Sequence, residues 1–160
     1  MAINIINEIT IVNLADDMKY IEEVATWLWD EWSKDLGAKL EDVIYSTKHS
    51  MCKDRVPQVY IAKFNDELVG TFSIWQNDLS SRQDLTPWLS VLYIKNEYRG
   101  QGIGTLLQEK CIQVVKDLGY ESLYLITDHE NYYERIGWEF LELTPFKGRL
   151  IRIYEYKIEK

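Results

Sequence analysis

The chain has 160 residues, of which 46% are hydrophobic and 28% are charged, a composition typical of globular domains. A chain of this length is expected to form one domain with a substantial core, spanning residues 1–160. Its net charge of −8 disfavours nucleic acids and anionic membranes as partners, because binding their phosphates requires a basic patch.

Hydrophobic periodicity predicts a strand and two helices in the first third of the chain. Apolar residues alternate from Ile3 to Val12, with an interruption near Asn7, and this pattern predicts a strand. Residues 14–36 have acidic residues in their first turn and apolar positions at helical spacing, so we expect a helix that ends at Gly37. A second helix is expected over residues 39–51.

The middle of the chain is β-type. Two apolar runs, 58–64 and 68–75, flank the turn residues 65–67 and predict a β-hairpin. Residues 79–86 are polar and predict a loop, and residues 88–94 predict the fourth strand.

A helix and a fifth strand follow. The helix is expected to reach residue 118, with Gly119 as its C-cap. Residues 122–127 are nearly all apolar, as in a central strand covered on both faces. A strand–helix–strand unit of this length predicts that 122–127 runs parallel to 88–94. The remaining predicted elements are a short helix and a closing hairpin: 132–136, 138–143 and 150–158.

Targeting, disulfide and metal signals are weak. The N-terminus has no basic region followed by a continuous apolar stretch, and no apolar run approaches membrane-spanning length, so we expect a cytoplasmic protein. Cys52 and Cys111 lie too far apart in sequence to suggest a disulfide framework. His49 and Cys52 have H-x-x-C spacing, but no second pair completes four ligands, and we expect no metal site.

The most informative motif is the glycine-rich segment from Arg99 to Gly104, which reads Arg-Gly-Gln-Gly-Ile-Gly. It connects the fourth predicted strand to the helix that follows. Such a turn exposes backbone N–H groups at the positive end of the helix dipole, a geometry that suits a phosphate or pyrophosphate. The glycines let the backbone approach the anion closely, and Arg99 adds a positive charge.

Two common phosphate-binding motifs do not fit this segment. A P-loop has lysine and then serine or threonine after its last glycine, whereas Thr105 and Leu106 follow Gly104. A dinucleotide-binding fold has G-x-G-x-x-G spacing, whereas the glycines here stand at 100, 102 and 104.

A third motif fits. Arg99 to Gly104 resembles the Q/R-x-x-G-x-G/A signature of the GNAT superfamily of acetyl-CoA-dependent N-acetyltransferases, in which this loop holds the pyrophosphate of coenzyme A. Residues 131–138 resemble a second signature of that family, F-Y-x-x-x-G-F/Y/W. Asn96 stands where many members have proline, but asparagine also favours a turn. The resemblance covers nearly the whole chain.

The resemblance implies the fold and the cosubstrate. The expected fold is an α/β (α+β) domain with a mixed central sheet of six to seven strands, splayed between the fourth and fifth strands, and about four helices. Acetyl-CoA is the implied cosubstrate; its pantetheine arm would lie in the splayed gap and bond to unpaired backbone groups of the fourth strand. The residues expected to bind it are Leu92, Tyr93, Ile94, Arg99, Gly100, Gln101, Gly102, Ile103, Gly104 and Thr105.

Tyr133 occupies the tyrosine position of the second signature and is predicted to be the general acid that protonates the departing thiolate. The alternative is that its ring only packs against the pantetheine arm. Tyr132 is expected to point elsewhere and to join the core.

The base that deprotonates the amine is left open. His129 follows the fifth strand at the sheet edge where α/β sites gather, and it is one candidate; the alternative is that it orders the turn through hydrogen bonds. Glu31, Asp84 and Asp128 are the other candidates.

Aromatic residues are expected to form the acceptor pocket, near the first two helices and the loop before the fourth strand. Its tentative residues are Trp29, Trp32, Asp84 and Trp88. An aromatic wall can hold a cation or an apolar group, so the pattern does not identify the acceptor.

These features predict an enzyme that transfers an acetyl group from acetyl-CoA directly to a primary amine of a small molecule or peptide. The alternative is a CoA-binding regulatory module of the same fold without turnover. Either a monomer or a homodimer is compatible with the sequence.

Overall fold

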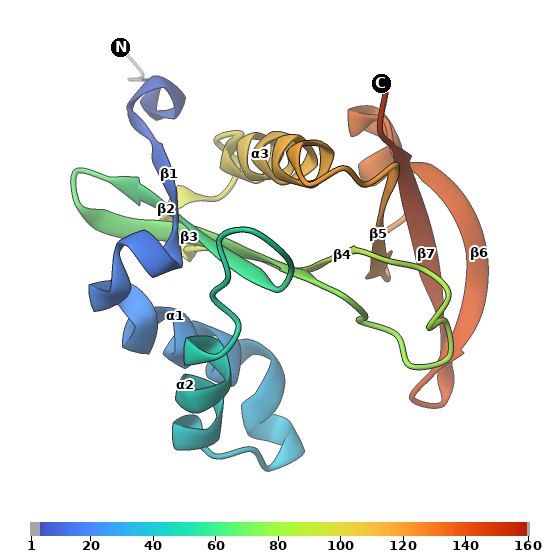
Figure 1. The fold of residues 1–160 in the computed structure, drawn as a ribbon, viewed down its shortest axis with the longest axis horizontal. Helices are drawn as coiled ribbons and strands as arrows, with labels where there is room; N and C mark the ends of the chain where they lie inside the picture. Colours follow the sequence, from blue (N-terminus) through green and yellow to red (C-terminus); the bar gives the residue numbers. More distant parts are fainter. Residues whose placement is uncertain (1–3, 160) are drawn as a thin grey trace.

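The computed structural model describes residues 4–159, which form one mixed seven-stranded sheet covered by helices on both faces (Figure 1). The strand order is β1-β2-β3-β4-β5-β7-β6, and every neighbouring pair is antiparallel except β4 and β5. The strands are β1 (Thr10–Asn13), β2 (Gln58–Phe64), β3 (Glu67–Trp75), β4 (Trp88–Ile94), β5 (Ser122–Thr127), β6 (Glu139–Phe146) and β7 (Arg149–Lys157).

Three α-helices flank the sheet. Helices α1 (Ile21–Leu28) and α2 (Leu40–Lys48) lie on one face, and α3 (Ile103–Asp117) lies on the other (Figure 1). The mixed sheet and the parallel β4–β5 pair confirm the predicted fold class. The fourth expected helix, at residues 132–136, is a 3-10 helix over Tyr133–Ile136.

The expected first strand is largely wrong. Residues Ile5–Glu8 form a 3-10 helix, because the Asn4 side chain accepts a hydrogen bond from the backbone N–H of Ile6 (3.3 Å) and caps the turn. Only Thr10–Asn13 pairs with β2. Ile3, where we expected the strand to begin, lies outside the described residues.

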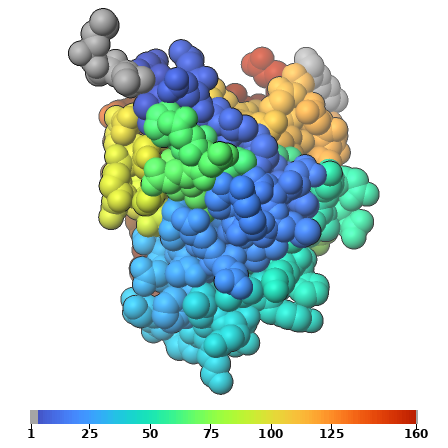
Figure 2. All heavy atoms as spheres, turned by 90° about the vertical axis from the view of Figure 1, so that its left-hand side faces the viewer, coloured from blue at the N-terminus to red at the C-terminus, as the bar shows by residue number. Residues whose placement is uncertain are grey.

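The expected first helix is divided into short segments. The Asn13 side chain accepts from the N–H of Ala15 (2.9 Å), and Asp17 has non-helical backbone angles, so two 3-10 turns precede α1. After α1 the chain forms a π-helical turn over Trp29–Ser33, and Gly37 ends the segment with a φ of 83°. Figure 2 shows the face built by this N-terminal half, with the turn between β2 and β3 above α1 and α2.

The main core lies between α3 and the sheet. The buried face of α3 contributes Leu107, Cys111 and Val115, which belong to the same apolar cluster as Phe72 of β3 and Leu125 of β5. This packing fixes the start of α3 against the end of β4.

Strands β4 and β5 separate soon after they meet. Trp88 opposite Tyr124 is the one residue pair in register between them, and the Tyr124 N–H donates to the Pro87 carbonyl (3.0 Å). Ser90 lies at a bulge, since Val91 pairs with Ser73 and Leu89 with Ile74 of β3. Figure 1 shows the β5–β7–β6 part of the sheet turned away from β1–β4. The second half of β4 therefore has a backbone edge that β5 does not pair.

Within residues 4–159 no helix is both long and apolar enough to cross a membrane.

Candidate functional site

A cleft of about 560 Å³ opens where β4 separates from β5. Four segments contribute to it: the π-helical turn after α1, the second half of β4, the glycine-rich segment and the loop after β5. The lining residues are Glu31, Trp32, Leu92, Tyr93, Ile94, Tyr98, Arg99, Gly100, Gly102, Ile103, Gly104, Thr105, His129, Tyr132 and Tyr133. Most of the residues predicted for cosubstrate binding thus come together in one place.

The start of α3 faces this cleft without a cap. Gly102 is the N-cap residue, with a φ of 86° and therefore no side chain to bond the first turn. The first helical hydrogen bond is donated by Leu106 to the Gly102 carbonyl (3.1 Å), so the N–H groups of residues 103–105 have no partner within the helix. Such a helix start attracts an anion.

Gly102 and Gly104 differ in their surroundings. A Cβ on Gly102 would lie 2.7 Å from the Cδ1 of Ile6, whereas a Cβ on Gly104 would make ordinary contact with the Tyr132 hydroxyl at 3.6 Å. Of these two glycines, Gly102 is the one that combines a left-handed backbone with a close neighbour.

Arg99 is held beside the end of β4. Its Nε donates to the Ile94 carbonyl (2.8 Å), and its guanidinium lies 5.3 Å from the ring centroid of Tyr93. Gln101, in contrast, does not line the cleft; its side-chain amide donates to the Glu97 carbonyl (3.4 Å).

Tyr133 is half-buried and lines the cleft. Its ring packs edge-on against Trp138 (centroids 6.1 Å apart) and at 5.9 Å from Tyr154. Burial raises the pKa of Tyr133 to about 12, the Tyr132 hydroxyl adds to the rise, and contact with the Thr127 hydroxyl opposes it. Tyr133 therefore keeps its proton at any working pH and can donate a hydrogen bond.

The expectation that Tyr132 belongs to the core is wrong. It is exposed and lines the cleft, with its ring 4.9 Å from that of Tyr133. The reason lies in the local backbone: Asn131 has a φ of 61°, and the segment that follows is a 3-10 turn rather than an α-helix. Tyr133 occupies the inner position, and Tyr132 remains over the start of α3.

His129 lies on the cleft surface. Its backbone N–H donates to the Thr127 hydroxyl (3.1 Å), and its exposed ring is 6.3 Å from that of Tyr132. The acidic residues on either side are both paired: Asp128 with Arg149 and Glu130 with Arg152.

The four tentative acceptor residues are separated in the structure. Trp32 lines the cleft and is 45% exposed. Trp29 does not line the cleft, because its indole N–H donates to the Ala38 carbonyl (2.8 Å). Trp88 is fully buried and donates to the Leu85 carbonyl (2.6 Å), and exposed Asp84 pairs with Arg82 (2.8 Å). Of the four, Trp32 is therefore the one that lines the cleft.

Sequence reasoning missed Asp78, in the loop between β3 and β4. This half-buried carboxyl lies beside the Ser90 hydroxyl at the β4 bulge, and burial raises its pKa to about 6, against the opposing effects of Ser90 and Lys147. In sequence Asp78 is one polar residue among several in a loop, and nothing local indicates its burial. A perturbed carboxyl next to a splayed strand is a candidate functional group.

The raised pKa of Asp78 implies that its charged form destabilises the folded protein. An acid whose pKa is about 6 in the folded chain and about 3.8 otherwise favours folding while protonated, and that benefit is lost as the pH rises from about 4 to 6. We expect Asp78→Asn to stabilise the protein at pH 7 by about 1–3 kcal/mol, since each pKa unit corresponds to about 1.4 kcal/mol. Urea unfolding at pH 4 and at pH 7 measures this difference.

Asp84→Asn in the same loop is the matched control. Arg82 lowers the pKa of the Asp84 carboxyl, so its removal should not stabilise the protein. An Asp78→Asn protein no more stable than wild type at pH 7 would show that the Asp78 charge is not costly.

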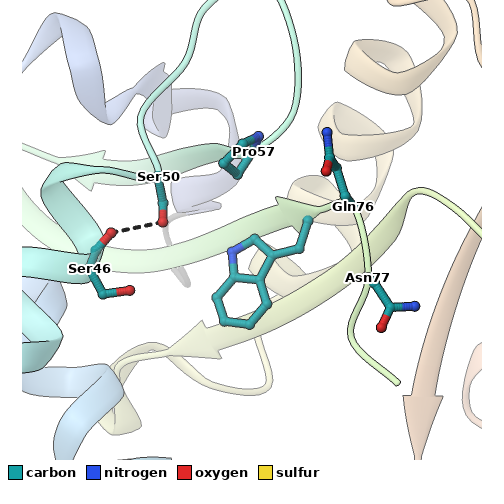
Figure 3. Close-up of a pocket in the computed structure, with 6 residues that line it drawn as sticks. Ser46, Ser50, Pro57, Gln76 and Asn77 are labelled. Atoms are coloured by element: carbon teal, nitrogen blue, oxygen red, sulfur yellow. Dashed lines mark hydrogen bonds between the residues drawn. The ribbon is translucent and has the colours of Figure 1, made fainter. Parts of the chain in front are cut away.

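A second cavity, of about 420 Å³, lies between α2 and the end of β3 (Figure 3). It is lined by Ser46, Ser50, Pro57, Trp75, Gln76 and Asn77. The Ser50 hydroxyl donates to the Ser46 carbonyl (2.8 Å), as Figure 3 shows. None of the predicted site residues lines this cavity. Nor does any group of three histidine, cysteine or acidic side chains in residues 4–159 come close enough together to hold a metal ion.

Comparison with known proteins identifies one family, and the relatives found are acetyltransferases. A family model described as "Acetyltransferase (GNAT) family" matches residues 21–138. N-alpha-acetyltransferase 30 of Schizosaccharomyces pombe is 33% identical over 84 residues, which cover 49% of this chain and 55% of that protein. The chain thus spans about half the length of this curated relative.

Solved structures share the fold at low identity. An aminoglycoside 6'-N-acetyltransferase complexed with coenzyme A matches with a TM-score of 0.74 and 16% identity, over 94% of this chain and 98% of that chain. A GNAT family acetyltransferase from Elizabethkingia anophelis with acetyl-CoA bound matches with a TM-score of 0.57 and 16% identity, over 94% and 99% of the two chains.

Proposed function

The chain belongs to the GNAT acetyltransferase family, and on this premise we propose that it transfers an acetyl group from acetyl-CoA directly to the nitrogen of a primary amine. The observation that carries the proposal is the uncapped start of α3 next to the unpaired edge of β4. The start of α3 suits a pyrophosphate, and the unpaired edge of β4 suits an extended chain with amide groups.

Each part of acetyl-CoA has a matching group in the proposed complex. The N–H groups of residues 103–105 would bind the pyrophosphate, with Arg99 beside it. The free edge of Leu92, Tyr93 and Ile94 would bond the pantetheine amides as a neighbouring strand does. Coenzyme A or acetyl-CoA in two solved structures of the same fold supports this arrangement.

Tyr133 is the proposed proton donor to the sulfur. A neutral amine attacks the thioester carbonyl, the carbon–sulfur bond breaks, and the thiolate leaves. A tyrosine with a pKa of about 12 is a weaker acid than a free thiol with a pKa of about 8.5. However, desolvation in the same cleft also raises the pKa of the thiol. The difference between the pKa values of Tyr133 and the thiol is therefore smaller there than in water. A backbone N–H of β4 would polarise the thioester carbonyl.

Direct transfer is favoured over an acyl-enzyme. Neither cysteine lines the cleft, and burial raises the pKa of the Cys111 thiol, which keeps it protonated and unreactive.

Of the bases considered from the sequence, Asp84 and Asp128 are paired with Arg82 and Arg149, and Glu31 lines the cleft beside Trp32. We consider two other groups for accepting the amine proton. His129 lies in the cleft, and Asp78 lies beside Ser90, two residues before Leu92 on β4. A general base works best when its pKa lies near the working pH, and burial raises the pKa of Asp78 to about 6. We expect kcat/KM to lose an acid limb near pH 6 in Asp78→Asn if Asp78 is the base. If that limb persists in Asp78→Asn and disappears in His129→Asn, His129 is the base.

A regulatory module that binds CoA without turnover is the alternative. The two are distinguished by thiol release from acetyl-CoA measured against a panel of primary amines. Transfer predicts thiol release that depends on at least one amine. Tight acetyl-CoA binding by calorimetry with no amine-dependent thiol release would favour the module.

A further inference from the structure

The π-helical turn Trp29–Ser33 directs two side chains into the cleft. Asp30 pairs with Lys34 (3.4 Å), and the Trp29 indole donates to the Ala38 carbonyl, so both are engaged outside the cleft. Glu31 and Trp32, in contrast, line the cleft. Single π-helical turns often occur at functional sites, because the extra residue changes which side chains share a face.

The Glu31 carboxylate has no charge partner of its own. It is the one acidic side chain among the cleft-lining residues of the described chain, and no hydrogen bond or ion pair within residues 4–159 engages it. Asp128 and Glu130, next to the cleft, are neutralised by Arg149 and Arg152. A cation entering the cleft would therefore be attracted chiefly to Glu31.

Aromatic rings extend from Glu31 toward Arg99. Trp32 meets Tyr93 edge-on (centroids 6.2 Å apart), and Trp27 packs against Tyr93 at 5.1 Å. The Arg99 guanidinium contacts the same Tyr93 ring. The cleft lining therefore combines a positive group, Arg99 beside the start of α3, with the Glu31 carboxylate and an aromatic wall.

We propose that Glu31 and Trp32 bind a second, non-reacting cationic group of the acceptor, so that the preferred acceptor is a diamine or polyamine. This inference rests on the acetyl transfer proposed above. The group held at Glu31 is not the reacting one, because a neighbouring carboxylate raises the pKa of an ammonium group and keeps it protonated. The reacting nitrogen must instead be neutral. Trp32 adds a cation–π contact to the bound charge.

The experiment compares linear monoamines and diamines of matched length by thiol release from acetyl-CoA. We expect wild-type kcat/KM to favour the diamine by about 10- to 100-fold, the range that one charge-assisted contact provides. This preference should fall as salt is raised, because Glu31 is exposed to solvent.

Matched variants test which residue carries the preference. Glu31→Gln should bring the diamine kcat/KM down to the monoamine level, whereas Asp30→Asn removes the neighbouring charge and should keep the preference. Trp32→Leu should weaken the preference more than Trp32→Phe, which retains an aromatic face.

Two negative results are distinguishable. Equal wild-type kcat/KM values for monoamines and diamines, or a preference that survives in Glu31→Gln, would overturn this inference while acetyl transfer stands. No thiol release with any amine would overturn acetyl transfer itself.

Discussion

A Gly102→Glu variant is expected to bind acetyl-CoA roughly 100-fold more weakly than wild type, or not at all. The new carboxylate would stand at the uncapped start of α3, where its charge competes with the pyrophosphate for the N–H groups of residues 103–105. Its Cβ would also displace the flexible end of Ile6, which lies 2.7 Å away. Isothermal calorimetry with acetyl-CoA measures the loss.

The control variant must introduce the same backbone strain and the same charge at a position away from the proposed anion site. Gly119 has a φ of 89°, close to the 86° of Gly102, and no atom lies within 4 Å of an added Cβ. Gly119→Glu therefore matches both the strain and the charge at the far end of α3, and it should bind acetyl-CoA normally. If a folded Gly102→Glu protein binds as tightly as Gly119→Glu, the glycine-rich segment is not the pyrophosphate site.

Tyr133→Phe is expected to lower kcat by about 10²–10⁴-fold, the usual contribution of general acid catalysis. Phenylalanine preserves the ring contacts with Trp138 and Tyr154, so acetyl-CoA affinity should remain near the wild-type value. Pre-steady-state thiol release separates the chemical step from product release. A variant whose chemical step runs at the wild-type rate would reduce Tyr133 to a packing residue.

Tyr154→Phe controls for the loss of a neighbouring phenol. Its hydroxyl donates to Glu134 (2.7 Å) and is not in the cleft, so this variant should lose stability rather than kcat. The pKa of about 12 also fixes the expected pH profile of the wild type. Because Tyr133 stays protonated below that value, its ionisation should produce no alkaline loss of activity in the usual working range.

Local sequence signals predicted the elements that build the cleft. The β-type run of β4, the Arg99–Gly104 glycines and the apolar β5 segment are each recognisable within a few residues, and the structure brings them together. The crossover through α3 between them then allows β4 and β5 to run parallel.

What the sequence could not predict depends on tertiary packing. In sequence, Asp78 resembles an exposed loop residue and Trp88 resembles a pocket residue, but in the folded sheet Asp78 is half-buried and Trp88 is fully buried. Helical geometry predicts that Tyr132 joins the core, but Asn131 has a left-handed backbone and Tyr132 is exposed. Similarly, the alternating apolar residues near the N-terminus predict a strand, but the Asn4 side chain caps a 3-10 helix over Ile5–Glu8.

The most direct test of the account quantifies free thiol and acetylated amine in the same reaction by mass spectrometry. Direct transfer through this cleft predicts equal amounts of the two products, no acetylated enzyme, and loss of both products in Gly102→Glu but not in Gly119→Glu. Thiol release without acetylated amine, or turnover that persists in Gly102→Glu, would contradict it.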